Sequence, residues 1–77
     1  MAFINITVQL NDDRRDIKID SEQKIKAGIE VLRQSGKLPM GESCDYFHSR
    51  LNERLVSSYK TFAEEEIYDG DILTAIF

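Results

Sequence analysis

The stretch that decides the fold is "EEEIYDGDILTAIF", residues 64–77, in which a polar turn runs directly into an apolar strand. The turn is Asp69-Gly70-Asp71, which places a conformationally free glycine between two residues that favour turns. The strand that follows, "ILTAIF", is apolar on both faces. Strands of this kind lie centrally in a sheet, because both of their faces need cover. We therefore predict a sheet in which the last strand of the chain is a central one.

The first strand predicted from the sequence is "FINITVQL", residues 3–10, whose apolar and polar side chains alternate. This period of two indicates a half-buried strand. After the turn-forming residues "NDDR", the segment "RDIKID" alternates again through Ile17 and Ile19. Two alternating strands joined by a short polar turn form an antiparallel hairpin. We expect the first strand to lie beside the last one, since these are the two long apolar strands.

Between residues 20 and 36 the apolar period changes from two to that of a helix. The apolar stripe consists of Ile25, Ile29 and Leu32, spaced i, i+4 and i+7. We expect Asp20 or Ser21 to cap the first turn and Gly36 to end the helix in a left-handed conformation. Gly28 either lets the helix approach the sheet closely or is a residue that only weakens the helix.

The rest of the chain supplies two weaker strands. "SCDYFHSR", residues 43–50, is a strand with aromatic residues at its centre, and the sequence leaves its register open. "LV", residues 55–56, is a short pairing strand that leads into a long irregular connection. The order strand, strand, helix, strand, strand, strand predicts a single α+β domain over residues 1–77. Its two layers are a mixed sheet of four to five strands and one helix packed on that sheet.

The composition narrows the class of partner. The 77 residues are 42% apolar and 31% charged, with 10 Lys and Arg against 14 Asp and Glu. The net charge of −4 argues against binding to nucleic acid, which requires a basic face, and against adhesion to an anionic membrane. One cysteine, no signal peptide and no apolar run of about 20 residues predict a cytoplasmic protein with no membrane insertion. A protein is the partner class that remains.

The chemistry-bearing residues predict no enzyme, no cofactor and no metal site. Cys44 and His48 are even-spaced on a predicted strand, but no third residue completes a catalytic group. We interpret them as a half-buried thiol and a surface imidazole. Asp69-Gly70-Asp71 lacks the long ligand loop of a calcium site and is interpreted as a turn with Gly70 at positive φ. The acidic run Glu64-Glu65-Glu66 is either a solvated connection or a docking patch for a basic partner.

The outer face of the sheet, opposite the helix, is the predicted partner surface. If the helix covers the apolar face of the first strand together with Leu73, Ala75 and Phe77, the other face carries apolar side chains with no cover. These candidate partner-binding residues are Phe3, Phe47, Ile72 and Ile76. A contiguous apolar patch on a small protein marks an interaction site. Two alternatives remain open: the side chains shield one another, or the register is reversed.

The segment "RLVSSYKTFAEEEIYDGDILTAIF", residues 54–77, resembles the closing third of ubiquitin-like proteins. In those proteins a short strand leads through a connection to a tight acidic-glycine turn and the last strand. The matching residues here are Leu55, Val56, Thr61, Phe62, Ile67, Asp69, Gly70, Asp71 and Leu73. "IKAGIEVLRQSGKLP", residues 25–39, likewise resembles the ubiquitin helix and the Leu-Pro that follows it. The resemblance implies a ubiquitin-like β-grasp fold.

The sequence also resembles a group of small, free-standing bacterial ubiquitin-like proteins typified by YukD and EsaB. The features it shares with them are the length, the "DGDILT" finish and a chain that stops at the last strand. This resemblance implies an accessory or regulatory role in the type VII secretion systems of Gram-positive bacteria. The implied partner is the cytoplasmic part of the secretion ATPase or another membrane component of that machinery.

The sequence around Phe77 bears on a second class of function. Modifiers and sulfur carriers that share this fold act through a flexible C-terminal Gly-Gly, which an activating enzyme adenylates. Here the sequence ends on a bulky residue, with no glycine among the last six positions. We therefore expect a non-conjugating, protein-binding module. The alternative is a sulfur-carrier or modifier-type protein that acts with an activating enzyme.

Overall fold

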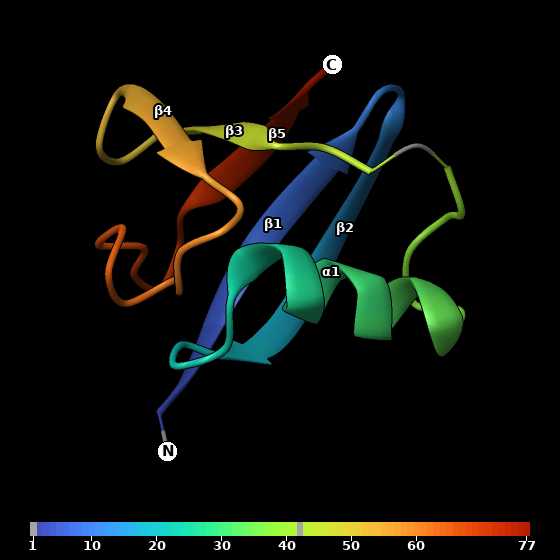
Figure 1. Cartoon of the computed structure of the whole chain (residues 1–77), viewed down its shortest axis with the longest axis horizontal. Helices are drawn as coiled ribbons and strands as arrows, with labels where there is room; N and C mark the ends of the chain where they lie inside the picture. The colour runs from blue at the N-terminus through green and yellow to red at the C-terminus, as the bar shows by residue number, and fades with distance from the viewer. Residues whose placement is uncertain (1, 42) are drawn as a thin grey trace.

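The structure of the protein is a computed structural model that describes residues 2–41 and 43–77. One helix lies across one face of a five-stranded sheet, as Figure 1 shows. In chain order the elements are β1 (Phe3–Leu10), β2 (Asp13–Asp20), α1 (Ile25–Gln34), β3 (Tyr46–Ser49), β4 (Arg54–Ser57) and β5 (Ile72–Ile76). The predicted α+β arrangement of a mixed sheet and one helix is confirmed.

The last strand is central, as its apolar character predicts. The strand order is β2-β1-β5-β3-β4. β5 pairs in parallel with β1, where Val8 lies opposite Leu73, and antiparallel with β3, where Phe47 lies opposite Ala75. The β1–β2 and β3–β4 pairs are antiparallel. The two halves of the sheet therefore meet along β5.

The β1–β2 hairpin follows the predicted alternation. Leu10 lies opposite Asp13, so that Asn11 and Asp12 form the turn, and Asn11 has φ 55°. Asparagine tolerates this left-handed conformation better than most residues. The inward row of β1 and β2 is buried and lies beneath α1. That row consists of Ile4, Ile6, Val8, Leu10, Ile17 and Ile19.

The helix is placed by its predicted apolar stripe, and its stripe residues are buried against the sheet. Its N-cap is Lys24, which makes no side-chain capping hydrogen bond, so the predicted cap by Asp20 or Ser21 is wrong. Asp20 Oδ1 instead accepts from the backbone N–H of Glu22 at 3.0 Å, in a turn that precedes the helix. Gly36 has the predicted positive φ of 81° just beyond the C-terminal end.

Gly28 marks the closest approach of helix and sheet. A Cβ at this position would lie 2.8 Å from Cδ1 of Ile19 and 3.4 Å from Cε2 of Phe62. A contact of 2.8 Å is shorter than real Cβ contacts, so a larger residue would displace Ile19 or lift the helix. Of the two alternatives for Gly28, the structure supports close approach.

Two aromatic residues are not placed as predicted. Phe47, predicted on the outer face, has 1% of its surface exposed and belongs to the core beneath α1. Strand side chains alternate between faces, so a register one residue away inverts the whole strand. Phe77, predicted to lie beneath the helix, is 58% exposed. Phe77 follows Ile76, the last residue of β5, so no neighbouring strand pairs with it and covers its side chain.

We expect Leu73→Ala to lower the free energy of unfolding by about 3 kcal/mol, because it removes a fully buried side chain and leaves a cavity in the middle of the sheet. Thr74→Ala is the matched control on the same strand, since Thr74 faces away from the core. Urea unfolding followed by circular dichroism measures both. Equal small losses for the two variants would contradict the assignment of faces on β5.

Candidate interaction surface

Three exposed apolar side chains lie together on the face of the sheet opposite α1. We call them the outer patch: Tyr46 on β3 is 53% exposed, Leu55 on β4 is 54% exposed and Ile76 on β5 is 43% exposed. Tyr46 lies directly opposite Ile76, which places their Cβ atoms roughly 5 Å apart. Leu55 lies opposite His48, one step along β3 from Tyr46 on the same face. Three neighbouring strands thus contribute to one apolar surface.

The outer patch contains one of the four predicted partner-binding residues. Ile76 is on the predicted face and is exposed, and Ile72 is on the same face but half-buried. Phe47 faces the core, and its neighbour Tyr46 occupies the outer-face position that was predicted for Phe47. The relevant signal was available in the sequence, because a tyrosine hydroxyl tolerates water whereas a phenylalanine ring favours the core. Leu55 was not predicted, since the short strand β4 carries too little pattern to assign a face.

Phe3 is on the outer face but is distant from the outer patch. Thr7 lies opposite Ile72 in the parallel β1–β5 pair. Phe3 lies four residues before Thr7 on β1, and Ile76 lies four residues after Ile72 on β5. At ~3.3 Å per residue, Phe3 and Ile76 are therefore roughly 26 Å apart along the strand direction. Lys18 Nζ lies 5.4 Å from the centre of the Phe3 ring, over its face. The four predicted residues therefore do not form one surface.

Cys44 and His48 are held in unrelated environments. The Cys44 thiol is buried and lies 2.6 Å from the backbone oxygen of Tyr46 and 3.1 Å from that of Ile76. His48 is exposed on the outer face, between Leu55 and Thr74. The thiol thus bonds to main-chain oxygens on the core side of the sheet, while the imidazole borders the outer patch.

The carboxylate of Asp71 ties the start of β5 to the end of β3. Oδ1 accepts from the backbone N–H of Leu51 at 3.0 Å and of Ile72 at 2.8 Å, and Oδ2 accepts from Ser49 Oγ at 2.6 Å. Ser49 Oγ in turn accepts from the backbone N–H and side-chain amide of Asn52. Asp71 and Ser49 are both fully buried. Sequence reasoning assigned Asp71 only to a turn and missed this network.

The acidic run is partly used to fold the connection that contains it. Thr61 and Glu64 form a reciprocal pair: the backbone N–H of Thr61 donates to Glu64 Oε1, and that of Glu64 donates to Thr61 Oγ1, both at 2.9 Å. The hydrogen bond from Thr61 holds the pKa of Glu64 below its ordinary value. Glu65 Oε2 accepts from the backbone N–H of Ser57 at 2.6 Å. These contacts favour the structural interpretation of the run over a docking patch.

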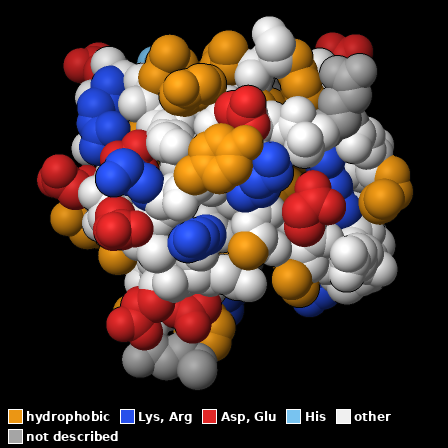
Figure 2. Space-filling model, in the orientation of Figure 1, with side chains coloured by type: hydrophobic (Ala, Val, Ile, Leu, Met, Phe, Trp, Pro, Cys, Tyr) orange, Lys and Arg blue, Asp and Glu red, His pale blue; other side chains and the backbone are white. Residues whose placement is uncertain are grey.

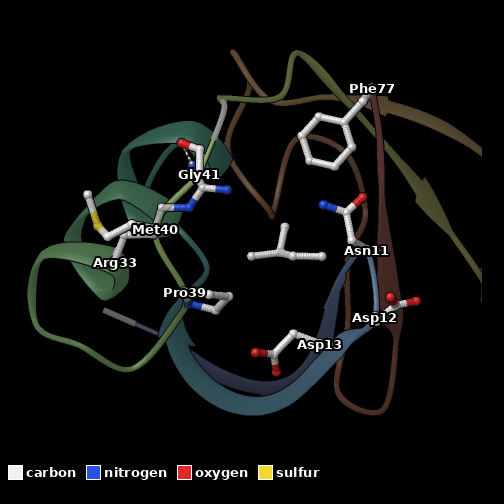
Figure 3. Close-up of a pocket in the computed structure, with 9 residues that line it drawn as sticks. Asn11, Asp12, Asp13, Arg33, Pro39, Met40, Gly41 and Phe77 are labelled. Carbon is white, nitrogen blue, oxygen red and sulfur yellow. Dashed lines mark hydrogen bonds between the residues drawn. The ribbon is translucent and has the colours of Figure 1, made fainter.

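A hollow of about 610 Å³ opens beside Phe77. As Figure 3 shows, Arg33, Pro39 and Met40 lie on one side of it and Asn11 and Phe77 on the other. Arg33 is buried and donates to the backbone oxygen of Gly41 at 3.1 Å, which ties the end of α1 to the following segment. The hollow is open to solvent, and the described residues that line it include no pair of nucleophile and base.

The helix-covered side of the molecule carries mixed charge. In Figure 2, which looks onto that side, acidic and basic side chains are interspersed over much of the surface, and apolar side chains gather along the upper edge of the view. Tyr59 contributes to one local network: its hydroxyl donates to Asp45 Oδ1 at 2.7 Å and accepts from Lys26 Nζ at 3.2 Å. This hydrogen bond between Lys26 and Tyr59 is the main cause of the raised pKa of Lys26.

Residues 2–41 and 43–77 contain neither a cluster of metal ligands nor a membrane-spanning helix. No group of three or more His, Cys, Asp or Glu residues is placed so that it could hold a metal ion in this part of the chain. The helix that the structure describes is also too short and too polar to span a membrane.

The comparisons with known proteins support the fold. No family model matches the chain, and no curated protein matches it. Among solved structures, the chain is similar to the ubiquitin-like domain of EccD5 from Mycobacterium xenopi, with a TM-score of 0.63 and 18% sequence identity. The match covers 100% of this chain and 96% of that domain. The predicted ubiquitin-like β-grasp fold is thereby confirmed.

We expect Asp71→Ala to lower the free energy of unfolding by about 3 kcal/mol, because it leaves the buried Ser49 hydroxyl and two part-buried backbone N–H groups without their acceptor. Asp12→Ala, in the exposed turn of the hairpin, is the control and should change stability by less than about 0.5 kcal/mol. Urea unfolding measures both. A loss for Asp71→Ala as small as that of the control would refute the role given to this carboxylate.

Proposed function

We propose that the protein is a non-enzymatic, non-conjugating ubiquitin-like module that binds another protein through the outer patch. The observation that carries this proposal is the exposure of Tyr46, Leu55 and Ile76 side by side on the uncovered face of the sheet. Aromatic and large aliphatic side chains that lose their hydration on docking supply most of the energy of a protein interface. The polar rim required around such a patch is present in His48 and Thr74.

The pathway we infer is type VII secretion, in an accessory or regulatory role. The resemblance of the sequence to the group typified by YukD and EsaB, with its "DGDILT" finish, suggests this pathway. The structural likeness to a ubiquitin-like domain of EccD5 is consistent with it. The partner is then a cytoplasmic region of the membrane machinery, with its ATPase as the first candidate, and the module works in the cytoplasm.

The alternative, action as a sulfur carrier or modifier, has less support. That chemistry requires a flexible small-residue tail that can enter the site of an activating enzyme. None of the four glycines stands next to another, and Ile76 is the last residue of a paired strand.

We expect Ile76→Asp and Tyr46→Asp each to weaken binding to the cytoplasmic part of the secretion ATPase by at least about tenfold, since each places a charge in a desolvated contact. Both variants should stay folded, because the side chains are half exposed. Isothermal titration calorimetry with the purified ATPase region measures the binding constant.

Val31→Asp is the matched control for these variants, because Val31 is an exposed apolar residue on the helix side, 53% accessible. Its binding constant should equal that of the unchanged protein. If the control weakens binding as much as Ile76→Asp does, or if Ile76→Asp unfolds the domain, then the docking surface has been assigned to the wrong face.

Incubation with ATP and a ubiquitin-type activating enzyme should leave the mass of the protein unchanged. The reason is that no two of the four glycines are adjacent, so these residues offer no Gly-Gly to be adenylated. Intact-mass spectrometry detects an adenylate or thioester directly, and a sulfur carrier with its own Gly-Gly tail is the positive control. Either adduct on this chain would favour the alternative function.

A further inference from the structure

The two edge strands of the sheet differ in what covers their outward backbone groups. On β4, the outward N–H of Ser57 donates to Glu65 Oε2 at 2.6 Å, and the outward oxygen of Leu55 accepts from Arg54 at 3.3 Å. The connection that follows β4 therefore blocks this edge. Side chains that cap an edge in this way prevent a further strand from pairing with it.

The β2 edge is open by comparison. The backbone N–H of Ser21 donates to the oxygen of Ala2 at 2.7 Å, which fixes the alternation of the β1–β2 ladder. The backbone groups of Arg14, Asp16 and Lys18 therefore point away from β1. Within the described residues, these outward groups make no hydrogen bond. This edge thus presents a free row of donors and acceptors.

The side chains along this open edge alternate in charge. The outer-face row of β2 reads Arg14, Asp16, Lys18 and Asp20, that is plus, minus, plus, minus. When this row lies antiparallel to the same row of a second copy, every positive side chain faces a negative one. Opposite charges facing each other across two strands stabilise the pairing, and like charges oppose it.

We propose that the β2 edge pairs antiparallel with β2 of a second copy of this chain. The twofold axis passes through Ile17, so that Asp16 of each copy faces Lys18 of the other, and Arg14 of each faces Asp20 of the other. The facing residues are those whose backbone groups point outward, so each Asp16–Lys18 pair exchanges two backbone hydrogen bonds. The two sheets become one continuous sheet.

The charges also select this register over its neighbours. If the axis moves to Asp16, Asp16 faces its own copy and Arg14 faces Lys18, so like charges oppose each other. If it moves to Arg15, that arginine faces itself on the helix side. With the axis at Ile17, Arg15 faces Ile19 of the second copy, and its charge is already offset by Asp13 of its own strand at 2.8 Å.

The helix side of the same edge has room for the second copy. A groove of about 330 Å³ runs along β2, with the buried Ile17 and Leu32 among its lining residues and Lys37 at its rim. In the proposed pairing Ile17 meets Ile17 in a non-hydrogen-bonded pair, where side chains approach most closely. The outer patch lies on β3, β4 and β5, away from this edge, so a dimer leaves it free for the proposed partner.

The test uses two single charge reversals. Each is expected to weaken self-association alone, and the two are expected to pair with each other when mixed. Lys18→Glu places a carboxylate opposite Asp16, and Asp16→Lys places an ammonium group opposite Lys18, twice in each homodimer. We expect each variant to weaken self-association about tenfold, as two like-charge pairs replace two opposite ones. An equimolar mixture restores both pairs, so it should associate as strongly as the unchanged protein. Sedimentation equilibrium at up to about 1 mM covers the range of small interfaces.

Lys60→Glu is the control for charge alone, because Lys60 is exposed and lies after β4, away from the β2 edge. It should self-associate like the unchanged protein, and circular dichroism should show all variants folded. Self-association should also weaken with added salt. A protein that stays monomeric at about 1 mM, single variants that associate normally, or a mixture that fails to regain association would each overturn the proposal.

Discussion

The register between β3 and β5, which places Tyr46 opposite Ile76, is held by the buried carboxylate of Asp71. It accepts three hydrogen bonds from groups at the end of β3 and the start of β5. Hydrogen bonds to an ionised acceptor are about twice as strong as neutral ones, and an unmatched buried carboxylate is costly. The arrangement therefore fixes which residue begins β5. Because strand side chains alternate, it also determines that Leu73 faces the helix and Ile76 faces away.

The two faces of the sheet around the central β5 differ in what covers them. One helix of ten residues covers one face, and Gly28 brings it close enough to bury the whole inner row. On the other face, the exposed apolar side chains Tyr46, Leu55 and Ile76 lie on β3, β4 and β5, and β2 carries a row of charged side chains. The proposed partner surface and the proposed self-pairing edge thus lie at opposite ends of the sheet, and the two interactions do not compete for the same residues.

Much of the fold follows from local sequence, whereas the site follows only in part. The alternation of residues 3–10 and the turn before Ile72 were sufficient to predict the hairpin and the central strand. The face of β3 was not predictable in the same way, because Tyr46 and Phe47 are adjacent aromatic residues and a shift of one residue exchanges them. The network around Asp71 joins residues 22 positions apart, so it has no local pattern.

The most direct test of the central claim is a titration of the isotope-labelled protein with the cytoplasmic part of the secretion ATPase, followed by two-dimensional NMR. Docking through the outer patch predicts that amide shifts change along β3, β4 and β5, with Tyr46, Leu55 and Ile76 at the centre of the affected region. Amides of α1 and β2 should stay unchanged. Changes centred on α1, or no changes at saturating partner, would contradict the account.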